Sequence, residues 1–419
     1  MAIFPRNSAF SQVTTLAGLR PVHAAFAWLH GNPKTIMDWQ AELVAIPGPP
    51  FGEEARSEWL AAQFAQIGLS EVETDDAGNV FGTLPAANLP PENTGPVVVV
   101  SAHLDTVFPA ETPLNPQVNG DRLEAPGACD NGAGVAGMLA IAKAVLQAKV
   151  ALAAPLVFMG NVGEEGEGDL RGVRHLYSHS TLAGRIAGHI VLDGGGADSV
   201  VTQALGSRRF RVTVTGPGGH SFTDAGTPNP ITALVSALAI LAQTPLPEEP
   251  RTTLNLGTIQ GGTSVNSIPE SAQASIDFRS TDSEQLLRLE IALQRAVKEA
   301  VGHWNDPDKP RTTLGRGLLA FTIDKIGDRP AAHLPADSPL LETLRAVDRH
   351  LGLRTDLRLG STDANIPLAL GVPALSMGAG GDGGGAHTKA EWYCAKDRDA
   401  GLKRVLLLAL ATAEWAAEQ

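Results

Sequence analysis

Four consecutive valines, Val97–Val100, constrain the fold more than any other feature of the sequence. A short, wholly apolar and β-branched run is typical of a strand that is buried on both faces. Similar runs occur at Leu156–Val162 and His189–Leu192, and the small-residue-rich segment Gly132–Ala148 before them is expected to be helical. Strands that alternate with helices predict an α/β fold, with a mostly parallel sheet sandwiched by helices. Further helices are expected at Thr35–Val44 and Glu54–Ile67.

The pattern changes near Ser207. Arg209–Thr215 alternates polar and apolar residues, which is typical of a strand with one face in water. The elements that follow complete a β-α-β-β-α-β order, so we expect an inserted α+β domain of the ferredoxin-like kind. We expect residues 1–206 and 329–419 to form one domain around an inserted domain at 207–328. The later elements are Pro230–Ala242, Thr252–Gln260, Ala272–Arg279, Ser283–Trp304 and Ala320–Ile326, and the α/β pattern resumes with a strand at Val372–Met377.

Charge and cysteine content narrow the class of protein. The formal net charge of the 419 residues is −13, which argues against nucleic acid or an anionic membrane as a partner, because either would require a basic face. Two cysteines, Cys129 and Cys394, fit a reducing compartment. Residues 1–20 lack the pattern of a signal peptide, and the apolar run Ile231–Ala242 is too short to span a bilayer. We therefore expect a cytoplasmic protein.

Polar residues follow the ends of the predicted strands. Ligands of open α/β sheets bind at the carboxyl ends of the strands, where side chains from separate segments meet. Histidine nitrogens and carboxylate oxygens are together the ligand set of a zinc site. Such residues occur after four of the apolar strands and before the Gly132–Ala148 helix: His103, Asp105, Asp130, Glu164, Glu165, Asp193 and His387.

Each of these residues also fits a simpler interpretation when it is taken alone. An Asp-Asn-Gly sequence is usually a turn or a helix N-cap, and a pair of glutamates after a strand is often a solvated loop. Their coincidence at several strand ends is what indicates a catalytic site. By contrast, the small-residue context of Cys129 favours a buried packing residue, and Ser361 or Thr362 is expected to cap a helix.

The chain resembles the M20 metallopeptidase family over nearly its whole length beyond about residue 35. The resemblance implies a zinc-exopeptidase-like catalytic domain and an inserted lid domain that also mediates homodimerisation. For the first 30 residues, which have no counterpart, we expect an extra helix packed on the catalytic domain. The matching segments are Ser101–Val107, Gly127–Gly134, Gly163–Gly166, Gly216–Ser221, Gly261–Asn266 and Ala386–Thr388.

The resemblance implies two zinc ions per chain, although such sites also accept cobalt or manganese. Asp130 would bridge the two ions. His103 and Asp193 would complete the coordination of one ion, and Glu165 and His387 that of the other.

Two further carboxylates have implied roles beside the metals. Asp105 would hydrogen-bond His103 and fix its tautomer. Glu164 would be the general base. Two metals roughly 3.5–4 Å apart can share a water, lower its pKa and polarise a carbonyl, so that the water attacks it. A neighbouring carboxylate then passes the proton of the water to the leaving amine. The sequence alone leaves open which of the two adjacent glutamates is the base.

Within the inserted domain, the resemblance singles out three residues. His220 would reach the active site of the partner subunit and stabilise the tetrahedral oxyanion. Asn266 and Arg279 would hold the backbone or the carboxylate of the substrate. Taken without the resemblance, His220 fits a histidine in a glycine-rich turn and Arg279 a surface strand residue.

The substrate class rests on one position. An aspartate at position 193 resembles the aminopeptidase and dipeptidase branches of the family, and the chain is most similar to the tripeptidase (peptidase T-like) group. The favoured function is therefore amide hydrolysis in a small peptide. Three alternatives remain: a deacylase of N-acyl amino acids, like acetylornithine deacetylase; an M28-type aminopeptidase, which the inserted domain disfavours; and an inactive binding scaffold, which would have lost a ligand or the base.

Overall fold

The computed structural model describes residues 8–87, 95–306 and 317–418, and the chain divides into two compact units. The first unit joins Met1–Ala204 to His333–Gln419, and the second comprises Leu205–Ala332. The second unit thus begins two residues before the inserted segment expected at 207–328 and ends four residues after it (205 against 207, 332 against 328). Residues 1–7, which belong to the expected first domain, lie outside the described part of the chain.

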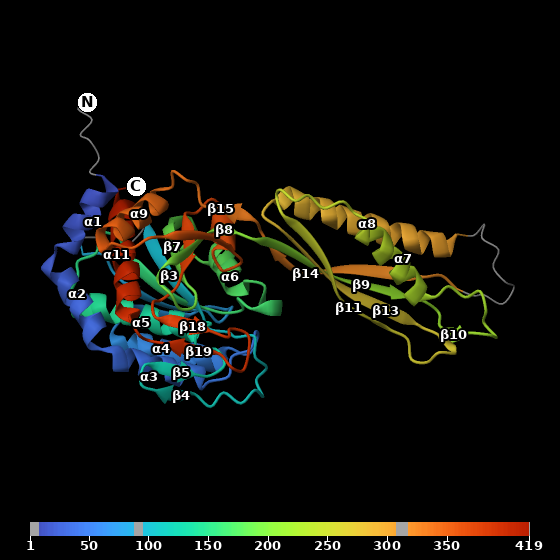
Figure 1. The fold of residues 1–419 in the computed structure, drawn as a ribbon, viewed down its shortest axis with the longest axis horizontal. Coiled ribbons are helices and arrows are strands. Elements are labelled where there is room, and N and C mark those ends of the chain that lie inside the picture. The colour runs from blue at the N-terminus through green and yellow to red at the C-terminus, as the bar shows by residue number, and fades with distance from the viewer. Residues whose placement is uncertain (1–7, 88–94, 307–316, 419) are drawn as a thin grey trace, which may run out of the picture. The chain divides into compact units, whose positions relative to one another are not determined.

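Among the described residues, the first unit contains a nine-stranded sheet with the order β1-β2-β6-β3-β7-β17-β8-β15, to which β16 adds beside β8 (Figure 1). β6, β3, β7 and β17 run parallel to one another, whereas β2 pairs with β6 and β8 with β17 in the antiparallel sense. The strands are β1 Ser70–Thr74, β2 Val80–Leu84, β3 Val97–His103, β6 Leu156–Asn161, β7 Ile186–Leu192, β8 Ser199–Ala204, β15 Ala332–His333, β16 Asp356–Gly360 and β17 Ala374–Met377.

Helices cover both faces of this sheet, as the wholly buried β3 requires. Val97 and Val99 pack in one apolar cluster with Val173 and Leu176 of α6. Their neighbours in β3 point to the opposite face, where α5 and α11 contact the strand. The predicted α/β fold, with a mostly parallel sheet sandwiched by helices, is therefore confirmed. The helices of this unit include α3 Pro33–Val44, α4 Glu54–Ile67, α5 Gly132–Gln147, α6 Arg171–His179, α9 Pro339–Leu351, α10 Asn365–Ala369 and α11 Arg398–Ala417.

The start of the described chain forms two helices, α1 Ala9–Ala17 and α2 Arg20–Gly31, where a single extra helix was expected. Leu19 lies between them, and Pro21 occupies the first turn of α2, a position where the missing N–H of proline costs nothing. α1 packs on α9 and α11, and α2 packs on α5. Both helices therefore belong to the first unit, in agreement with the expected packing on that domain.

The described residues of the first unit also form a small antiparallel sheet of four strands, with the order β18-β19-β5-β4. β18 and β19 form a hairpin, and β19 pairs with β5, so this sheet holds the loop that contains His387 against the segment that precedes Asp130. The strands are β4 Gln117–Asn119, β5 Arg122–Glu124, β18 Asp382–Gly384 and β19 Trp392–Cys394.

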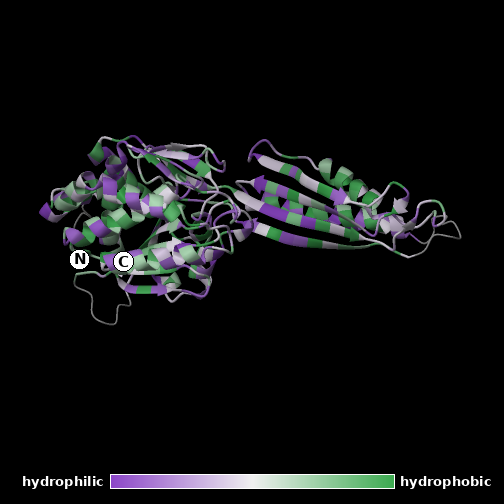
Figure 2. Ribbon diagram, turned by 90° about the horizontal axis from the view of Figure 1, so that it is seen from below, coloured by the Kyte–Doolittle hydropathy of each residue, from purple (hydrophilic) through white to green (hydrophobic). Residues whose placement is uncertain are grey.

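The second unit has the predicted β-α-β-β-α-β order. Its four-stranded antiparallel sheet, counted in the described residues, has the order β11-β13-β9-β14, and α7 and α8 pack against β9 and β13. Hydrophobic and hydrophilic residues alternate along these strands (Figure 2), because one face meets the helices and the other faces solvent. The elements are β9 Gly206–Thr215, α7 Pro230–Ala242, β11 Thr252–Gly261, β13 Ser271–Ser280, α8 Ser283–Asn305 and β14 Ala320–Arg329, with a short pair β10 Gly219–His220 and β12 Ser267–Ile268.

In the described part of the chain, none of the helices combines the length and the apolar composition needed to span a membrane. The long helix α11 is instead buried among neighbouring helices and β3 of the first unit. Arg404 of α11 donates to both carboxylate oxygens of Asp348 in α9, at 2.6 and 2.8 Å, and both side chains are almost fully buried.

We predict that Asp348→Asn lowers the free energy of unfolding by about 3 kcal/mol, because it leaves the buried Arg404 guanidinium without its counter-charge. Chemical denaturation of the two proteins measures this change. Lys34→Gln is the control: its partner Asp38 forms an ion pair whose side chains are 85% and 51% exposed, so no measurable change is expected. Equal stability of Asp348→Asn and wild type would contradict the prediction.

Candidate metal centre

The carboxyl ends of four adjacent parallel strands bring the predicted ligands together. β3 ends at His103, β7 is followed by Asp193, and the backbone N–H of Asp193 donates to the carbonyl of Met377 at the end of β17 (3.0 Å). β6 ends at Asn161, and Glu164 and Glu165 follow it within a few residues. Since parallel strands end at the same edge of a sheet, these side chains converge without any long-range adjustment of the backbone.

Asp130 lies between two imidazoles. Its Oδ1 is 3.1 Å from Nε2 of His103, and its Oδ2 is 3.0 Å from Nε2 of His387. The same Nε2 of His387 is 3.0 Å from Oε1 of Glu165, and Asp193 Oδ1 is 3.9 Å from His103. One carboxylate therefore turns each of its oxygens toward a different ligand group.

Potential ligand atoms gather in three overlapping groups, within each of which all atoms lie within 4.8 Å of one another. Asp130 is shared by the two groups that contain an imidazole and two carboxylates from separate segments. The described residues that form these groups are His103, Asp130 and Asp193; Asp130, Glu165 and His387; and His103, Glu164 and Glu165.

The donor set fits divalent cations. Oδ1 of Asp130 is buried, lies 3.1 Å from Nε2 of His103, and accepts no hydrogen bond from the described residues. A buried carboxylate oxygen of this kind is costly unless a positive charge completes its surroundings. Two imidazoles and several carboxylates are also the ligand types that zinc binds.

Asp105 does more than contact His103. Nδ1 of His103 is 3.0 Å from the backbone oxygen of Asp105 and 3.6 Å from its carboxylate. Both of these groups are acceptors, so Nδ1 carries a proton, and Nε2 faces Asp130. The carboxylate of Asp105 accepts the backbone N–H groups of Glu164 at 2.9 Å and Glu165 at 2.7 Å. Asp105 thus fixes the loop that contains both glutamates, a contact that the sequence did not indicate.

Charges in this cluster shift one another's pKa values in a consistent way. Burial disfavours the charged form of His103, but the carboxylates of Asp105, Asp130 and Asp193 outweigh it and hold the pKa of His103 well above its usual range. Burial likewise opposes ionisation of Asp130, yet the two imidazoles hold its pKa below its usual range. Hydrogen bonding to Asp130 raises the pKa of His387 to about 9. The cluster therefore favours bound positive charge.

Two residues outside the predicted ligand set hold the loop around Asp130 through hydrogen bonds. Asn131 accepts the N–H groups of Gly134 and Gly194, each at 3.1 Å, and donates to the carbonyl of Leu192 at 2.8 Å. Asn131 thereby joins the loop to the end of β7. Glu391, four residues after His387, accepts the backbone N–H of Asp130 at 2.7 Å. Asn131 is the N-cap of α5, as is usual for an Asp-Asn-Gly sequence, whereas the bond from Glu391 leaves no trace in the sequence because it binds a backbone group that every residue possesses.

Two other expectations concern residues near the site. The Cys129 thiol is buried, accepts the N–H of Gly195 at 3.3 Å, and has its pKa raised by burial to about 12, in agreement with a packing residue. The expected helix cap at Ser361 or Thr362 is wrong: α10 has Ala364 at its N-cap without a side-chain bond, and the Thr362 hydroxyl accepts the N–H of Ala364 at 3.2 Å in the turn before the helix begins.

The segment before α10 contains a buried carboxylate that was not among the predicted site residues. Asp363 accepts a hydrogen bond from the Asn161 side chain at 2.7 Å, beside the end of β6. Burial raises the pKa of Asp363 to about 7.

Of the three residues expected in the lid, His220 and Asn266 lie together. β10, which ends at His220, pairs with β12, and the N–H of Ser221 donates to the carbonyl of Asn266 at 2.9 Å. Nδ1 of His220 accepts the N–H groups of Phe222 and Thr223, at 3.2 and 3.3 Å, so its ring is held within its own turn.

Arg279 lies in β13 of the four-stranded sheet, at the end away from the short pair of β10 and β12. In the register of β13 and β9, Ser271 faces Thr215 and Arg279 faces Ser207. Eight residues of extended strand separate the two ends by roughly 27 Å. Arg279 donates to Asp277 at 2.7 Å. Within this unit, Arg279 therefore does not form one site with His220 and Asn266.

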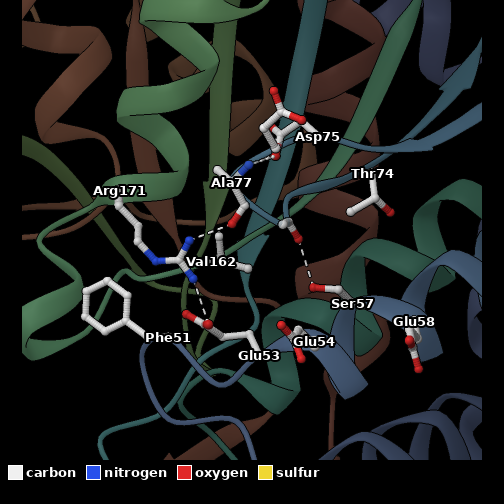
Figure 3. Close-up of a pocket in the computed structure, with 12 residues that line it drawn as sticks. Phe51, Glu53, Glu54, Ser57, Glu58, Thr74, Asp75, Ala77, Val162 and Arg171 are labelled. Atoms are coloured by element: carbon white, nitrogen blue, oxygen red, sulfur yellow. Dashed lines mark hydrogen bonds and ion pairs between the residues drawn. The ribbon is translucent and has the colours of Figure 1, made fainter.

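A cavity of about 430 Å³ lies beside the strand end that leads to Glu164, and none of the residues predicted for the site lines it (Figure 3). Arg171 points between the carbonyl of Ala77 and the carboxylate of Glu53, at 2.5 and 2.7 Å. A Cβ atom at Gly163, whose φ is +66°, would lie 2.5 Å from the Arg171 side chain, so glycine is required there. Arg171 thus braces the backbone just before the two glutamates.

Comparison with known proteins identifies the family of the chain. A family model described as peptidase family M20/M25/M40 matches residues 99–411. The uncharacterized protein YqjE of Bacillus subtilis (strain 168) is 22% identical over 374 residues, which are 86% of this chain and 93% of that protein. Succinyl-diaminopimelate desuccinylase of Methylorubrum extorquens is 26% identical over 285 residues, which are 62% of this chain and 72% of that enzyme. A tripeptidase from Staphylococcus aureus subsp. aureus Mu50 has a similar fold, with a TM-score of 0.71, 21% identity and coverage of 93% of this chain and 99% of that one.

We predict that the metal-free protein loses stability as the pH rises. The folded-state pKa of His387 is raised from 6.5 to about 9, so its protonated ring stabilises the fold fully below pH 6.5 and ceases to do so as the pH rises through 9. The melting temperature of the metal-free wild type should therefore fall between pH 6.5 and 9 by more than that of His387→Gln. Parallel melting curves for the two proteins across this range would contradict the prediction.

Proposed function

The chain belongs to peptidase family M20/M25/M40 and is a metal-dependent hydrolase, and on this premise we propose that it uses two zinc ions to hydrolyse an amide bond in a small peptide. The observation that carries the proposal is the carboxylate of Asp130, whose two oxygens face His103 and His387 separately. His103 and Asp193 would hold one ion with Asp130, and Glu165 and His387 the other. Cobalt or manganese would also fit these ligand types.

When bound, two such cations would polarise the scissile carbonyl and lower the pKa of a water molecule. The protein residues do the rest. Asp105 accepts the backbone N–H of Glu164 at 2.9 Å, which fixes the position of the Glu164 backbone beside the candidate ligands. We assign Glu164 as the general base that takes a proton from water and delivers it to the leaving amine. Each ligand and the base are present, which speaks against an inactive scaffold.

A free peptide is the substrate that the chain supports best. Asp193 occupies the position where aspartate resembles the peptidase branches, and the fold is similar to that of a tripeptidase. The second candidate is deacylation of an N-acyl amino acid, because succinyl-diaminopimelate desuccinylase is among the relatives. Both reactions break an amide bond at the same centre and differ only in what lies on either side of it.

The second unit would act as a lid and as the surface of a homodimer. His220 and Asn266 lie by the short pair of β10 and β12, near the exposed side chains of Phe222 and Val265, whereas Arg279 lies at the far end of the four-stranded sheet. A site that uses all three would therefore draw them from two chains. In that arrangement His220 would stabilise the oxyanion in the partner, and Arg279 and Asn266 would bind the substrate backbone or carboxylate.

A hydrolysis screen of the zinc-loaded protein tests the substrate class. Di- and tripeptides with free amino termini are compared with N-acetyl and N-succinyl amino acids. Cleavage of the free peptides alone would support the peptidase, whereas cleavage of the acylated amino acids alone would make the chain a deacylase with the same metal centre. Absence of any cleavage by a protein that holds two zinc ions would contradict both functions.

We predict that Glu164→Gln keeps the fold and the metal but lowers kcat by several orders of magnitude, because glutamine cannot accept the proton of the attacking water. Steady-state kinetics and metal analysis of the same preparation measure both effects. Near wild-type turnover would remove Glu164 from the mechanism.

A second prediction concerns the shared carboxylate. Asp130→Ala should lower the bound zinc from about two ions per chain, since it removes the ligand common to both sites. Elemental analysis after dialysis gives the stoichiometry, and Lys34→Gln provides a matched surface control. Unchanged zinc content in Asp130→Ala would refute the bridging role.

A further inference from the structure

Glu391 is a buried carboxylate that the proposed reaction does not use. Its side chain is 1% exposed, and it accepts three backbone N–H groups of the loop that contains Asp130. Oε1 accepts from Cys129 at 2.8 Å and from Asp130 at 2.7 Å, and Oε2 accepts from Gly127 at 2.7 Å. Both oxygens are thus occupied by the backbone, which leaves Glu391 unsuited to be a ligand or a base.

The position of Glu391 couples two segments that are distant in the sequence. It follows His387 by four residues, and its own N–H donates to the carbonyl of Thr388 at 3.2 Å. The Thr388 hydroxyl in turn donates to the carbonyl of Gly385 at 2.7 Å, which closes the turn around His387. One side chain therefore connects the backbone of Asp130 with the loop of His387.

Burial raises the pKa of Glu391, and the hydrogen bonds from the backbone oppose this shift. Arg56 is buried, donates to the carbonyls of Ile46 and Leu104 at 2.8 and 2.7 Å, and interacts electrostatically with both Glu391 and Asp105. The three N–H groups hydrogen-bond the Glu391 carboxylate without any cation, and the positive charge of Arg56 acts on it electrostatically. These interactions therefore hold the conformation of the Asp130 loop in the metal-free protein.

We propose that Glu391 is a positioning residue that preorganises the metal centre, fixing the backbone of Asp130 relative to His387 before any cation binds. The inference rests on the proposed two-metal function, but the hydrogen bonds from which it is argued are those of the metal-free chain. A partner of this kind that orients a ligand usually contributes about 10- to 100-fold to metal affinity.

Amide hydrogen exchange of the metal-free wild type tests the preorganisation directly. The N–H groups of Gly127, Cys129 and Asp130 should be protected without metal, because Glu391 accepts them. Rapid exchange of this segment that slows only after zinc is added would show that the metal orders the loop, and the inference would fail. This measurement needs no variant to fold.

Glu391→Gln is the informative variant. Glutamine keeps one acceptor oxygen but turns an NH2 group toward at least one of the three N–H donors. We expect the three amides to exchange roughly tenfold faster or more, zinc affinity in a chelator competition to fall about 10- to 100-fold, and the visible spectrum of the Co²⁺-loaded protein to change. Asp348→Asn, another buried carboxylate of the same unit that meets Arg404, is the matched control and should change only the melting temperature.

The outcomes separate the inference from the function on which it rests. A Glu391→Gln protein that only melts at a lower temperature, with the affinity and Co²⁺ spectrum of wild type, would reduce Glu391 to a structural residue. If Glu391→Gln does not fold, the exchange of the wild-type amides decides. A wild type that binds no metal would overturn the proposed function, while the exchange rates of the two metal-free proteins would still judge the positioning role.

Discussion

The arrangement of Asp130 between two imidazoles is the constraint around which the first unit is organised. The oxygens of Asp130 lie 3.1 Å from His103 and 3.0 Å from His387. This geometry requires a fixed backbone at Asp130. The parallel strands β3, β6 and β7 lead to candidate ligands at one edge of the sheet, and the small sheet of β18 and β19 holds the loop of His387. Asn131 and Glu391 then fasten the loop of Asp130 from two sides.

Burial of so many carboxylates in one place depends on how each is compensated. Asp105 meets two backbone N–H groups and lies near Arg56, whereas Asp130 meets two imidazoles. Asp363 has only the Asn161 side chain as a hydrogen-bond donor among the contacts described, and burial raises its pKa to about 7. The cluster thus contains carboxylates whose pKa values are lowered, Asp105 and Asp130, beside others whose pKa values burial raises, namely Glu165, Asp363 and Glu391.

The convergence of the candidate ligands could be predicted because their positions follow from strand ends, and strand ends are visible in apolar runs such as Val97–Val100. α4 and α7 were also predicted within their observed bounds, because amphipathic spacing and proline mark them clearly. The hydrogen bonds of Glu391 and Asp105 escaped prediction, since both side chains bind backbone N–H groups, which leave no trace in residue identity. Arg279 illustrates a third limit: only the strand register shows that it lies far from His220.

The connection between the two units has a consequence for the history of the chain. β9 and β14, through which the chain enters and leaves the second unit, are neighbours in its sheet, and Ser207 faces Arg329. The entry and exit points are therefore only about 5 Å apart. For the first unit, a segment with such closely spaced ends is equivalent to a long surface loop. The entropic cost of closing a loop grows only slowly with its length, so a change in the length of this segment costs the first unit little stability. Recombination could thus replace this module, or a short linker could close the gap, while the catalytic unit keeps its own sheet continuous.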